Sequence, residues 1–388
     1  MIFNINEEVL QSKSAYWTAK EISQQPDTWK KTLNQITKQY QEISNFINEI
    51  LKTDDFEIIF TGAGTSEFVG NAVFSYLNKL TNYKAKSYAT TDIVATPENY
   101  LNKDRPTLLV SFGRSGNSPE SVAAVELANV VCNKIKHLFI TCNHEGALSK
   151  FALASDNCYA INLTPETHDK GFAMTSSFTN MYLAALLVFL LKTKKVDEQM
   201  SIITKNVEEL LYNDFRVFSD LVNDFDFNRI VYLGSNSNKG IAQESALKML
   251  ELSAGNVATM YDSPMGFRHG PKSIINDQTL VVVYLSDDEY TRQYELDVIK
   301  EMSTQRKGNK ILALSGYHDT EVEVLVDYYH TFFNEIKLDN IFLGLEYIVV
   351  AHLLSLFKSM SYDITPDNPC PSGEVNRVVA GVTIYPYK

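Results

Sequence analysis

The hydrophobic pattern of the first 50 residues is that of amphipathic helices. Apolar side chains recur there at spacings of three and four positions, which places them on one face of a helix. These side chains are Trp29, Leu33, Ile36, Tyr40, Ile43 and Ile47. Because Asp27 follows Pro26, the pattern also predicts Asp27 as the N-cap of this helix.

After residue 50 the pattern changes to short apolar runs that alternate with amphipathic segments. The apolar runs are FEIIFTG (56–62), TLLVSFG (107–113), HLFITCN (137–143) and CYAINL (158–163). Helical patterns cover residues 66–80 and 119–132. Buried strands that alternate with helices predict an α/β fold, with a parallel sheet flanked by helices in three Rossmann-like layers.

The same series of segments begins again at NRIVYLGSNS (228–237). The two copies align at a constant offset of 172 residues, which pairs Gly62 with Gly234 and Thr107 with Thr279. HLFITCN and KILALSG follow in the same order. This predicts a tandem duplication of one α/β domain. The predicted parts are a helical segment over 1–50, a first domain over 51–198 and a second domain over 199–388.

Composition and charge exclude several classes of function. The net charge of −12 argues against a nucleic acid partner, because phosphate backbones require clustered Lys and Arg. The four cysteines form no CxxC pair and MIFNINEEVLQ is unlike a secretory signal, so we expect a cytoplasmic protein. The apolar run MYLAALLVFLL (181–191) is too short to cross a membrane and predicts a buried helix, so no membrane partner is expected.

The loop after residues 107–113 has the features of an anion site. In a parallel α/β sheet, strand-to-helix loops lie at the carboxyl edge, where ligands bind. Ser118 and Pro119 suit the N-cap and first position of a helix, so free amides and the positive helix end face the loop. Two glycines allow close backbone approach. Arg114 supplies a full positive charge in this loop.

Two further hydroxyl-rich runs follow strand ends. TGAGTSEF (61–68) places Thr65 and Ser66 at a helix start, and MTSSFT (174–179) begins a long helix. Ser and Thr also cap helices without any ligand, which is the alternative for each run alone. Three such runs at successive strand ends predict a site for one phosphate monoester. GAGTSEFVG lacks the GxGxxG spacing and no Walker lysine is present, which argues against a dinucleotide or nucleotide hydrolysis.

The second domain differs at the aligned loop and carries its own unusual cluster. Asp287 replaces the hydroxyl of Ser115 there, so only the first domain is expected to bind phosphate. In IAQESALKMLELS (241–253), Glu244, Lys248 and Glu251 share one helix face. A solvated ion-pair ladder is the alternative, but this helix starts at the ligand edge of the sheet. Downstream, MGFRHGP places His269 on a glycine-rich loop.

A carboxylate, a histidine and a phosphate cradle together suit proton transfer between C1 and C2 of a phosphorylated sugar. A base must pass a proton between these carbons, and a desolvated glutamate can do so. A second acid/base group must open the sugar ring, and the ordinary pKa of histidine lies near the working pH. The chemistry requires no cofactor, and no His/Cys/Asp cluster has the spacing of a metal site.

Together these residues resemble the SIS (sugar isomerase) family in its tandem-domain form. SFGRSGNS resembles the family's phosphate loop, and ESALKMLELS with HGP resembles the catalytic helix and histidine loop of the isomerase half of glucosamine-6-phosphate synthase. The resemblance covers residues 50–388 and implies Glu251 as the C1/C2 base, Glu244 and Lys248 as its supporting pair, and His269 as the ring-opening group. Its implied phosphate ligands are Ser66, Arg114, Ser115 and Ser118. It also implies a homodimer or larger homo-oligomer, since the family's histidine loop reaches a neighbouring subunit's site.

Two departures narrow the resemblance to one branch. The synthase carries an amino-terminal cysteine glutaminase, whereas the first cysteine here is Cys132. In the tail, Arg377 matches the family's arginine, but Gly381 stands where a lysine acts on the sugar, which argues against amide-nitrogen transfer. QQPDTW (24–29), THDKGFAMTSSFTNM (167–181) and the tail are similar to tagatose-6-phosphate ketose/aldose isomerases and galactosamine-6-phosphate deaminases.

The leading hypothesis is hydrolytic deamination of galactosamine 6-phosphate to tagatose 6-phosphate and ammonia, in amino sugar catabolism. Interconversion of an aldose and a ketose 6-phosphate without deamination is the closest alternative. A sugar-phosphate sensor is the rival from another class, although a sensor would have no use for Glu251 and His269. His168 either lines the site or lies on the surface, and Arg268 either contacts substrate or forms a salt bridge. Arg377 is a candidate substrate ligand.

Overall fold

The computed structural model describes residues 1–192, 195–333, 336–379 and 381–387, and within them the chain forms two parallel five-stranded sheets. The chain divides into two compact units, each built on one sheet. The first-sheet unit comprises Asp27–Lys170, Met174–Val196 and Ser372–Lys388. The second-sheet unit comprises Met1–Pro26, Gly171–Ala173 and Asp197–Pro371. The domain limits at residues 50 and 198 stay a prediction, because these units join segments that are distant in sequence.

The first sheet has the strand order β2-β1-β3-β4-β5, with parallel pairing throughout. Its strands are β1 (Glu57–Gly62), β2 (Ala85–Ala89), β3 (Thr107–Gly113), β4 (Ile135–Thr141) and β5 (Cys158–Asn162). β1 and β3 are buried along their whole length, as expected of central strands rich in Ile, Leu, Val and Phe. Their carboxyl ends therefore meet at one edge, where the connecting loops lie.

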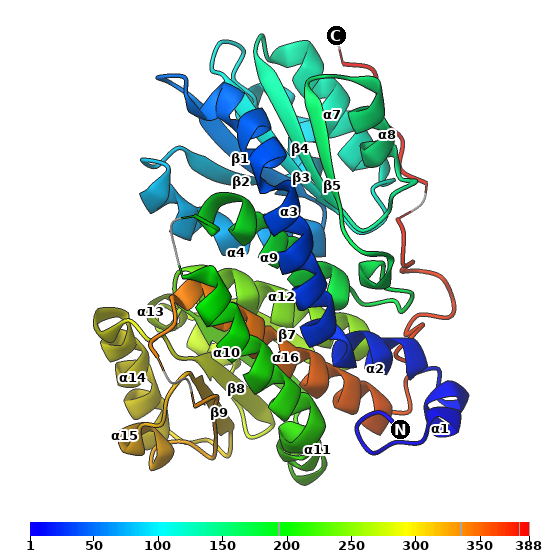
Figure 1. Cartoon of the computed structure of the whole chain (residues 1–388). Coiled ribbons are helices and arrows are strands. Elements are labelled where there is room, and N and C mark those ends of the chain that lie inside the picture. Colours follow the sequence, from blue (N-terminus) through cyan, green and yellow to red (C-terminus); the bar gives the residue numbers. More distant parts are fainter. Residues whose placement is uncertain (193–194, 334–335, 380, 388) are drawn as a thin grey trace. The chain divides into compact units, whose positions relative to one another are not determined.

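Helices cover both faces of this sheet, as the alternating pattern predicts. They are α3 (Gln25–Leu51), α4 (Thr65–Leu80), α5 (Thr90–Ala95), α6 (Pro97–Tyr100), α7 (Pro119–Val131), α8 (Ala147–Ala154), the 3-10 turn Pro165–Thr167 and α9 (Ser176–Leu190). α9 is buried almost throughout and packs against α4 (Figure 1). The buried helix predicted around 181–191 is thus confirmed. Trp29 of α3 fixes α3 to α9, because its indole N–H donates to Thr179 Oγ1 at 3.0 Å.

The second sheet has the order β10-β9-β8-β6-β7, which is the same parallel arrangement in the second copy. Its strands are β6 (Arg229–Gly234), β7 (Ala258–Asp262), β8 (Thr279–Tyr284), β9 (Lys310–Ser315) and β10 (Tyr328–Thr331). The register confirms the offset of 172, since Glu57 pairs with Thr107 and Arg229 pairs with Thr279. The predicted tandem α/β duplication is therefore confirmed.

The helices of the second-sheet unit include the longest apolar one of the chain's described part. They are α1 (Glu7–Ser12), α2 (Tyr16–Ser23), α10 (Val196–Glu209), the π turn Leu210–Asp214, α11 (Phe215–Asp224), α12 (Ser237–Leu252), α13 (Pro264–Phe267), the 3-10 turn Pro271–Ile274, α14 (Glu289–Thr304), α15 (Thr320–Glu323) and α16 (Asn340–Ser361). α16 is long and apolar enough to cross a membrane, but 94% of its most apolar window is buried. It packs along α12 as a core helix (Figure 1).

The strand-to-helix turn is the most closely repeated feature of the two copies. α4 begins three residues after β1, and α12 begins three residues after β6. The residue before each helix has nearly the same unusual backbone, with φ 56° and ψ −128° at Gly64 and φ 53° and ψ −122° at Asn236. A Cβ on Gly62 would collide with the backbone of Ser66, and one on Gly234 would collide with that of Asn238. Glycine is required because the helix start packs directly on the strand end.

One predicted boundary is wrong. Asp27 does not cap α3, since the helix begins at Gln25 and Asp27 lies in its first turn. The preceding Pro26 is itself helical, because the fixed φ of proline suits the first turn and its missing N–H has no intrahelical partner there.

Replacing Gly62 or Gly234 by Ala should destabilise its unit through the collision with the following helix. We expect a loss of about 1–3 kcal/mol in the free energy of unfolding for either variant, measured by urea denaturation and circular dichroism. Leu153→Ala, at an 88% exposed position of α8, is the control and should stay within about 0.5 kcal/mol of the parent. Parent-like stability of both glycine variants would contradict the close packing of the turn.

Candidate active site

The first turn of α4 presents two buried hydroxyl groups at the carboxyl edge of the first sheet. Thr65 and Ser66 are 4% and 6% exposed and occupy the first two positions of the helix. This confirms their predicted position at the helix start. The positive φ of Gly64 turns the chain so that the start of α4, with the positive end of its dipole, lies at this edge. Such a turn provides hydrogen-bond donors and a positive dipole for an anion.

The loop between β3 and α7 is held in shape by hydrogen bonds from the next connection of the sheet. Asn143 Nδ2 donates to the carbonyl oxygen of Ser115 at 2.8 Å, and the amide of Leu148 donates to that of Gly116 at 3.1 Å. Gly116 has φ +62°, a conformation that favours glycine. Ser118 is the predicted N-cap of α7, with its Oγ 3.4 Å from the amide of Ser121. The loop is thus prearranged before any ligand binds.

Arg114 connects this loop to the C-terminal tail within the first-sheet unit. The guanidinium of Arg114 is only 6% exposed and donates to the carbonyl oxygen of Arg377 at 2.5 Å. Arg377 in turn donates to the carbonyl oxygen of Asp169. His168 is half-buried beside them, and burial together with the charges of Arg377 and Arg114 lowers its pKa. The structure therefore gathers Arg114, Arg377 and His168 in one cationic cluster.

The third hydroxyl run is used differently from the prediction. Asp169 is fully buried and accepts hydrogen bonds from the amides of Thr175 and Ser177, both at 2.8 Å, and from the Ser177 hydroxyl at 2.6 Å. Burial raises the pKa of Asp169, while these hydrogen bonds and the charge of Arg114 oppose the rise. The run MTSSFT thus binds an internal carboxylate at the start of α9. A surface role for Asp169 is excluded by its burial.

In the second-sheet unit, the three charged residues of α12 form the cluster that their spacing predicts. Lys248 Nζ lies 3.3 Å from Glu244 Oε1 and also pairs with Glu251 Oε2. The side chains of Glu244 and Lys248 are 0% and 1% exposed, whereas that of Glu251 is 23% exposed. The alternative of a solvated ion-pair ladder is therefore wrong. Glu251 alone of the three remains accessible to a ligand.

Electrostatics keep the ammonium of Lys248 charged in spite of its burial. Burial acts to lower the pKa of Lys248, but the charges of Glu244 and Glu251 and their hydrogen bonds outweigh it and raise the pKa. Nearby, His352 of α16 is fully buried, with Nδ1 3.3 Å from Gln25 Nε2. Burial and then the charge of Lys248 lower the pKa of His352 to about 3. His352 is therefore a neutral neighbour of the cluster that the sequence analysis missed, because it lies in an apolar helix.

His269 lies on an exposed turn between α13 and the 3-10 turn that follows. Its amide donates to the carbonyl oxygen of Gly266 at 2.9 Å, and Ser263 caps α13 through the amide of Gly266 at 3.1 Å. Beside it, Arg268 Nε lies 2.7 Å from Glu301 Oε2. Of the two readings for Arg268, the salt bridge is thus observed.

In the second sheet, the loop that aligns with the loop between β3 and α7 is occupied by a carboxylate of its own chain. The amide and hydroxyl of Ser286 both donate to the carboxylate of Glu295 at 2.7 Å. Glu295 is fully buried, and burial raises its pKa while the hydrogen bonds from Ser286 and Ser235 lower it. At the offset of 172, Ser286 aligns with Arg114. The sequence argument named Asp287 as the obstacle to an anion, but the structure adds Glu295, which takes up the loop's donors.

The carboxyl edge of the first sheet and the charged cluster on α12 suit different parts of a reaction. The first-sheet edge offers hydroxyls, helix amides and arginine charge, which suit an anionic group such as a phosphate monoester. The α12 cluster offers a partly exposed carboxylate held by a buried lysine, which suits proton transfer. Among the described residues, no group of three His, Cys, Asp or Glu side chains is arranged to hold a metal ion.

Comparisons with known proteins give the context of these features. The SIS domain model matches residues 50–191. A protein from Shewanella sp. (strain ANA-3) named D-galactosamine-6-phosphate deaminase AgaS is 42% identical over 386 residues, which cover 99% of this chain and 95% of that protein.

Solved structures extend the similarity to three dimensions. A crystal structure from Clostridium novyi NT superposes with a TM-score of 0.97 at 46% identity and covers 100% of this chain and 99% of that chain. The crystal structure of tagatose-6-phosphate ketose/aldose isomerase from Escherichia coli superposes with a TM-score of 0.88 at 39% identity, covering 96% and 97% of the two chains.

Replacing Lys248 by Ala should leave two acidic groups on α12 without their cation. We expect a loss of about 3–5 kcal/mol in the free energy of unfolding, because a buried ion pair broken on one side leaves an uncompensated charge. Lys239→Ala is the matched control on the same helix, since Lys239 pairs with Asp262 at 3.0 Å but is 46% exposed. The control should lose less than about 1 kcal/mol. Equal losses in urea denaturation would contradict the paired state of Lys248.

Proposed function

Since the chain belongs to the SIS domain family, we propose that it is a sugar-phosphate deaminase that converts galactosamine 6-phosphate and water to tagatose 6-phosphate and ammonia. The observation that carries this function is the similarity to D-galactosamine-6-phosphate deaminase AgaS over 99% of the chain. The residues of both sheet units supply the chemistry that this reaction needs.

The phosphate group of the sugar binds at the edge of the first sheet. Its ligands are Thr65 and Ser66 at the start of α4 and Arg114, Ser115 and Ser118 of the loop before α7. Two helix amino termini and a buried guanidinium support this assignment, because both attract anions and form charge-assisted hydrogen bonds. Arg377 and His168 lie in the same cluster and act as further substrate ligands.

The reaction begins with ring opening and continues with proton transfer. His269 takes the proton from the O1 hydroxyl and returns one to O5 as the C1–O5 bond breaks, which gives the open-chain aldehyde. Glu251 then removes the proton from C2 and returns it to C1, while the aldehyde oxygen gains a proton and the amino group on C2 gives one up, both through solvent. The product of this transfer is a ketimine at C2. Water adds to that carbon and ammonia leaves, which yields tagatose 6-phosphate.

Glu244 and Lys248 act through Glu251. The lysine is held between the two carboxylates, so its charge fixes the position of the Glu251 carboxylate at the end of α12. Only Glu251 combines partial exposure with this support. That combination is what a general base requires, since the base must reach the substrate while its rotamer stays fixed.

A second candidate function is isomerisation of an aldose and a ketose 6-phosphate without loss of nitrogen. The name of the Escherichia coli structure, tagatose-6-phosphate ketose/aldose isomerase, favours it. The proton transfer is the same in both reactions, which differ in whether C2 carries an amine or a hydroxyl group. The further proposals are a cytoplasmic location and a homo-oligomer in which the exposed His269 turn serves a neighbouring copy.

Purified protein incubated with galactosamine 6-phosphate should release one ammonia for each tagatose 6-phosphate formed. Glu251→Gln should lower kcat by about 10²- to 10⁴-fold, because the amide cannot accept the C2 proton. A glutamate-dehydrogenase-coupled assay measures ammonia. The control is Glu323→Gln, at a glutamate with 57% exposure in the same unit, which should keep the parental rate.

The isomerase alternative is tested in parallel with the deaminase assay, with galactose 6-phosphate as the substrate. Faster turnover of this sugar than of galactosamine 6-phosphate would favour isomerisation over deamination. No turnover of either sugar would rule out both deamination and isomerisation. Parental activity of Glu251→Gln would show that another group is the base.

Replacing Arg114 by Ala should weaken binding of the phosphate group. We expect KM for galactosamine 6-phosphate to rise by about 10- to 100-fold, with a smaller change in kcat, because a charged hydrogen bond is lost. Inhibition by inorganic phosphate should weaken in parallel. Arg105→Ala is the control, since Arg105 pairs with Asp55 at 3.2 Å elsewhere in the same unit. An unchanged KM would contradict the role of Arg114.

A further inference from the structure

The turn that carries His269 is short and is held by local hydrogen bonds. It joins α13, which is only four residues long, to the 3-10 turn Pro271–Ile274. The His269 amide donates to the carbonyl oxygen of Gly266, but Gly270 after it has φ +114°, and a Cβ at Gly270 would meet no atom within 4 Å. Gly270 itself is thus not closely packed, while acid/base catalysis requires a histidine held in one position.

Glu301 of α14 supplies a further restraint from outside the turn. One oxygen of its carboxylate lies 2.7 Å from Arg268 Nε, and the other pairs with Lys272 Nζ. Arg268 directly precedes His269, and Lys272 follows it by three residues. A single carboxylate therefore binds a cation on each side of the histidine.

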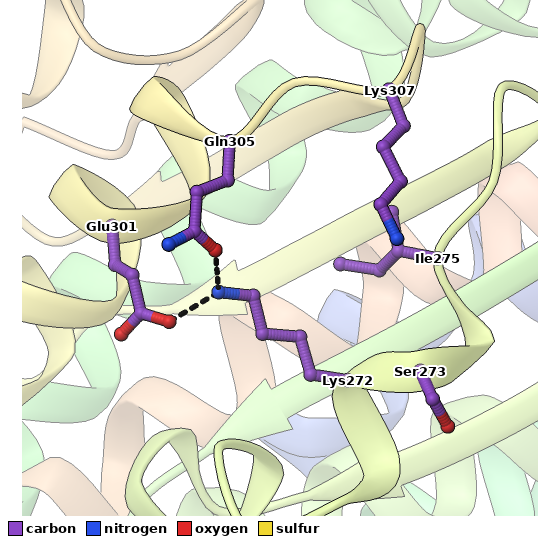
Figure 2. Close-up of a pocket in the computed structure, with 6 residues that line it drawn as sticks. All are labelled: Lys272, Ser273, Ile275, Glu301, Gln305 and Lys307. Atoms are coloured by element: carbon purple, nitrogen blue, oxygen red, sulfur yellow. Dashed lines mark hydrogen bonds and ion pairs between the residues drawn. The ribbon is translucent and has the colours of Figure 1, made fainter.

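Figure 2 shows how Lys272 is held at the second of these contacts. The side chain of Glu301 on α14 and that of Gln305, which directly follows the last residue of α14, both point at the ammonium group of Lys272. Gln305 Oε1 accepts from Lys272 Nζ at 2.6 Å. The last turn of α14 and the residue after it thus fix the end of the His269 turn through two acceptors.

The contact is stronger than an ordinary surface ion pair for two reasons. Glu301, Arg268 and Lys272 are 30%, 29% and 20% exposed, so solvent screens them only in part. A carboxylate shared by two cations also loses side-chain entropy once for two contacts. The hydrogen bond from Lys272 and the charges of both cations lower the pKa of Glu301, so the group is ionised at neutral pH.

We propose that Glu301 is a positioning residue for His269: its carboxylate clamps Arg268 and Lys272 and so holds the imidazole where it can pass a proton between O1 and O5 of the sugar. This inference rests on the proposed ring-opening role of His269. Glu301 contacts neither substrate nor imidazole and acts through the turn. Its loss misplaces the histidine, and displacement of a catalytic group by about 1 Å costs on the order of 100-fold in rate.

The test is a double-mutant cycle on full-length protein with galactosamine 6-phosphate as substrate. Glu301→Gln should lower kcat by about 10-fold or more while KM changes little, since the phosphate loop is untouched. In a His269→Asn background the same substitution should have no further effect, because the group that it positions is absent. Lys272→Ala removes one arm of the clamp and should lower kcat in the same direction.

Glu321→Gln is the matched control. Glu321 pairs with Lys300 of α14 at 2.7 Å, but both side chains are about half exposed and neither cation of the Glu301 clamp is part of this pair. This variant should keep the parental kcat. Hydrogen–deuterium exchange gives a readout that does not depend on activity: Glu301→Gln should speed exchange in residues 266–275, and Glu321→Gln should not.

The outcomes separate this inference from the proposed function. Parental turnover of His269→Asn would remove the ring-opening role of His269 and the positioning role with it. A slow His269→Asn variant beside a parental Glu301→Gln variant would overturn only the positioning role. An equal loss from Glu301→Gln in both backgrounds, or unchanged exchange in the turn, would likewise overturn it.

Discussion

One constraint on the second-sheet unit is that the buried positive charge of Lys248 must be paired with negative charges. The ammonium of Lys248 is fully buried, and it is tolerated only because Glu244 and Glu251 lie one turn to either side on the same helix. α12 packs against α16, and the side chains of Lys248 and Glu244 are buried. The same burial forces His352 to stay neutral beside Lys248. Of the three charged side chains of the cluster, that of Glu251 alone is partly exposed to solvent.

The two α/β domains contain copies of the same strand-to-helix loop. The copies differ in the groups that interact with the hydrogen-bond donors of the loop. In the first copy, the loop before α7 keeps its shape through Asn143 and leaves its helix start at the sheet edge. In the second copy, Glu295 fills the corresponding loop with a carboxylate of its own chain. An internal acid thus takes the place of a ligand, and the second unit is stabilised without any bound anion. α12 of the second unit carries the buried Glu244–Lys248–Glu251 cluster instead.

Sequence patterns predicted the central strands and the charged face of α12 because these features are local. A buried strand such as TLLVSFG and an i, i+4, i+7 triplet are visible without knowledge of the fold. The edge strands β2, β7 and β10 were missed, since they are half-exposed and short and their apolar signal is weak. The internal hydrogen bonds of Asp169 and the roles of Glu295 and Glu301 were missed for another reason. Each carboxylate is defined by a partner from another segment, and one sequence does not reveal which segment a carboxylate will meet.

The apolar helix α16 has a consequence for how the chain is made. Its partners α2, α11 and α12 all precede it in the chain, so a ribosome delivers them first. Until α16 emerges, the second half of the nascent polypeptide exposes the apolar surface that α16 will cover. Exposed apolar surfaces of this kind favour aggregation or chaperone binding. Co-translational folding of the first half can proceed early, whereas the second half must wait for one late segment.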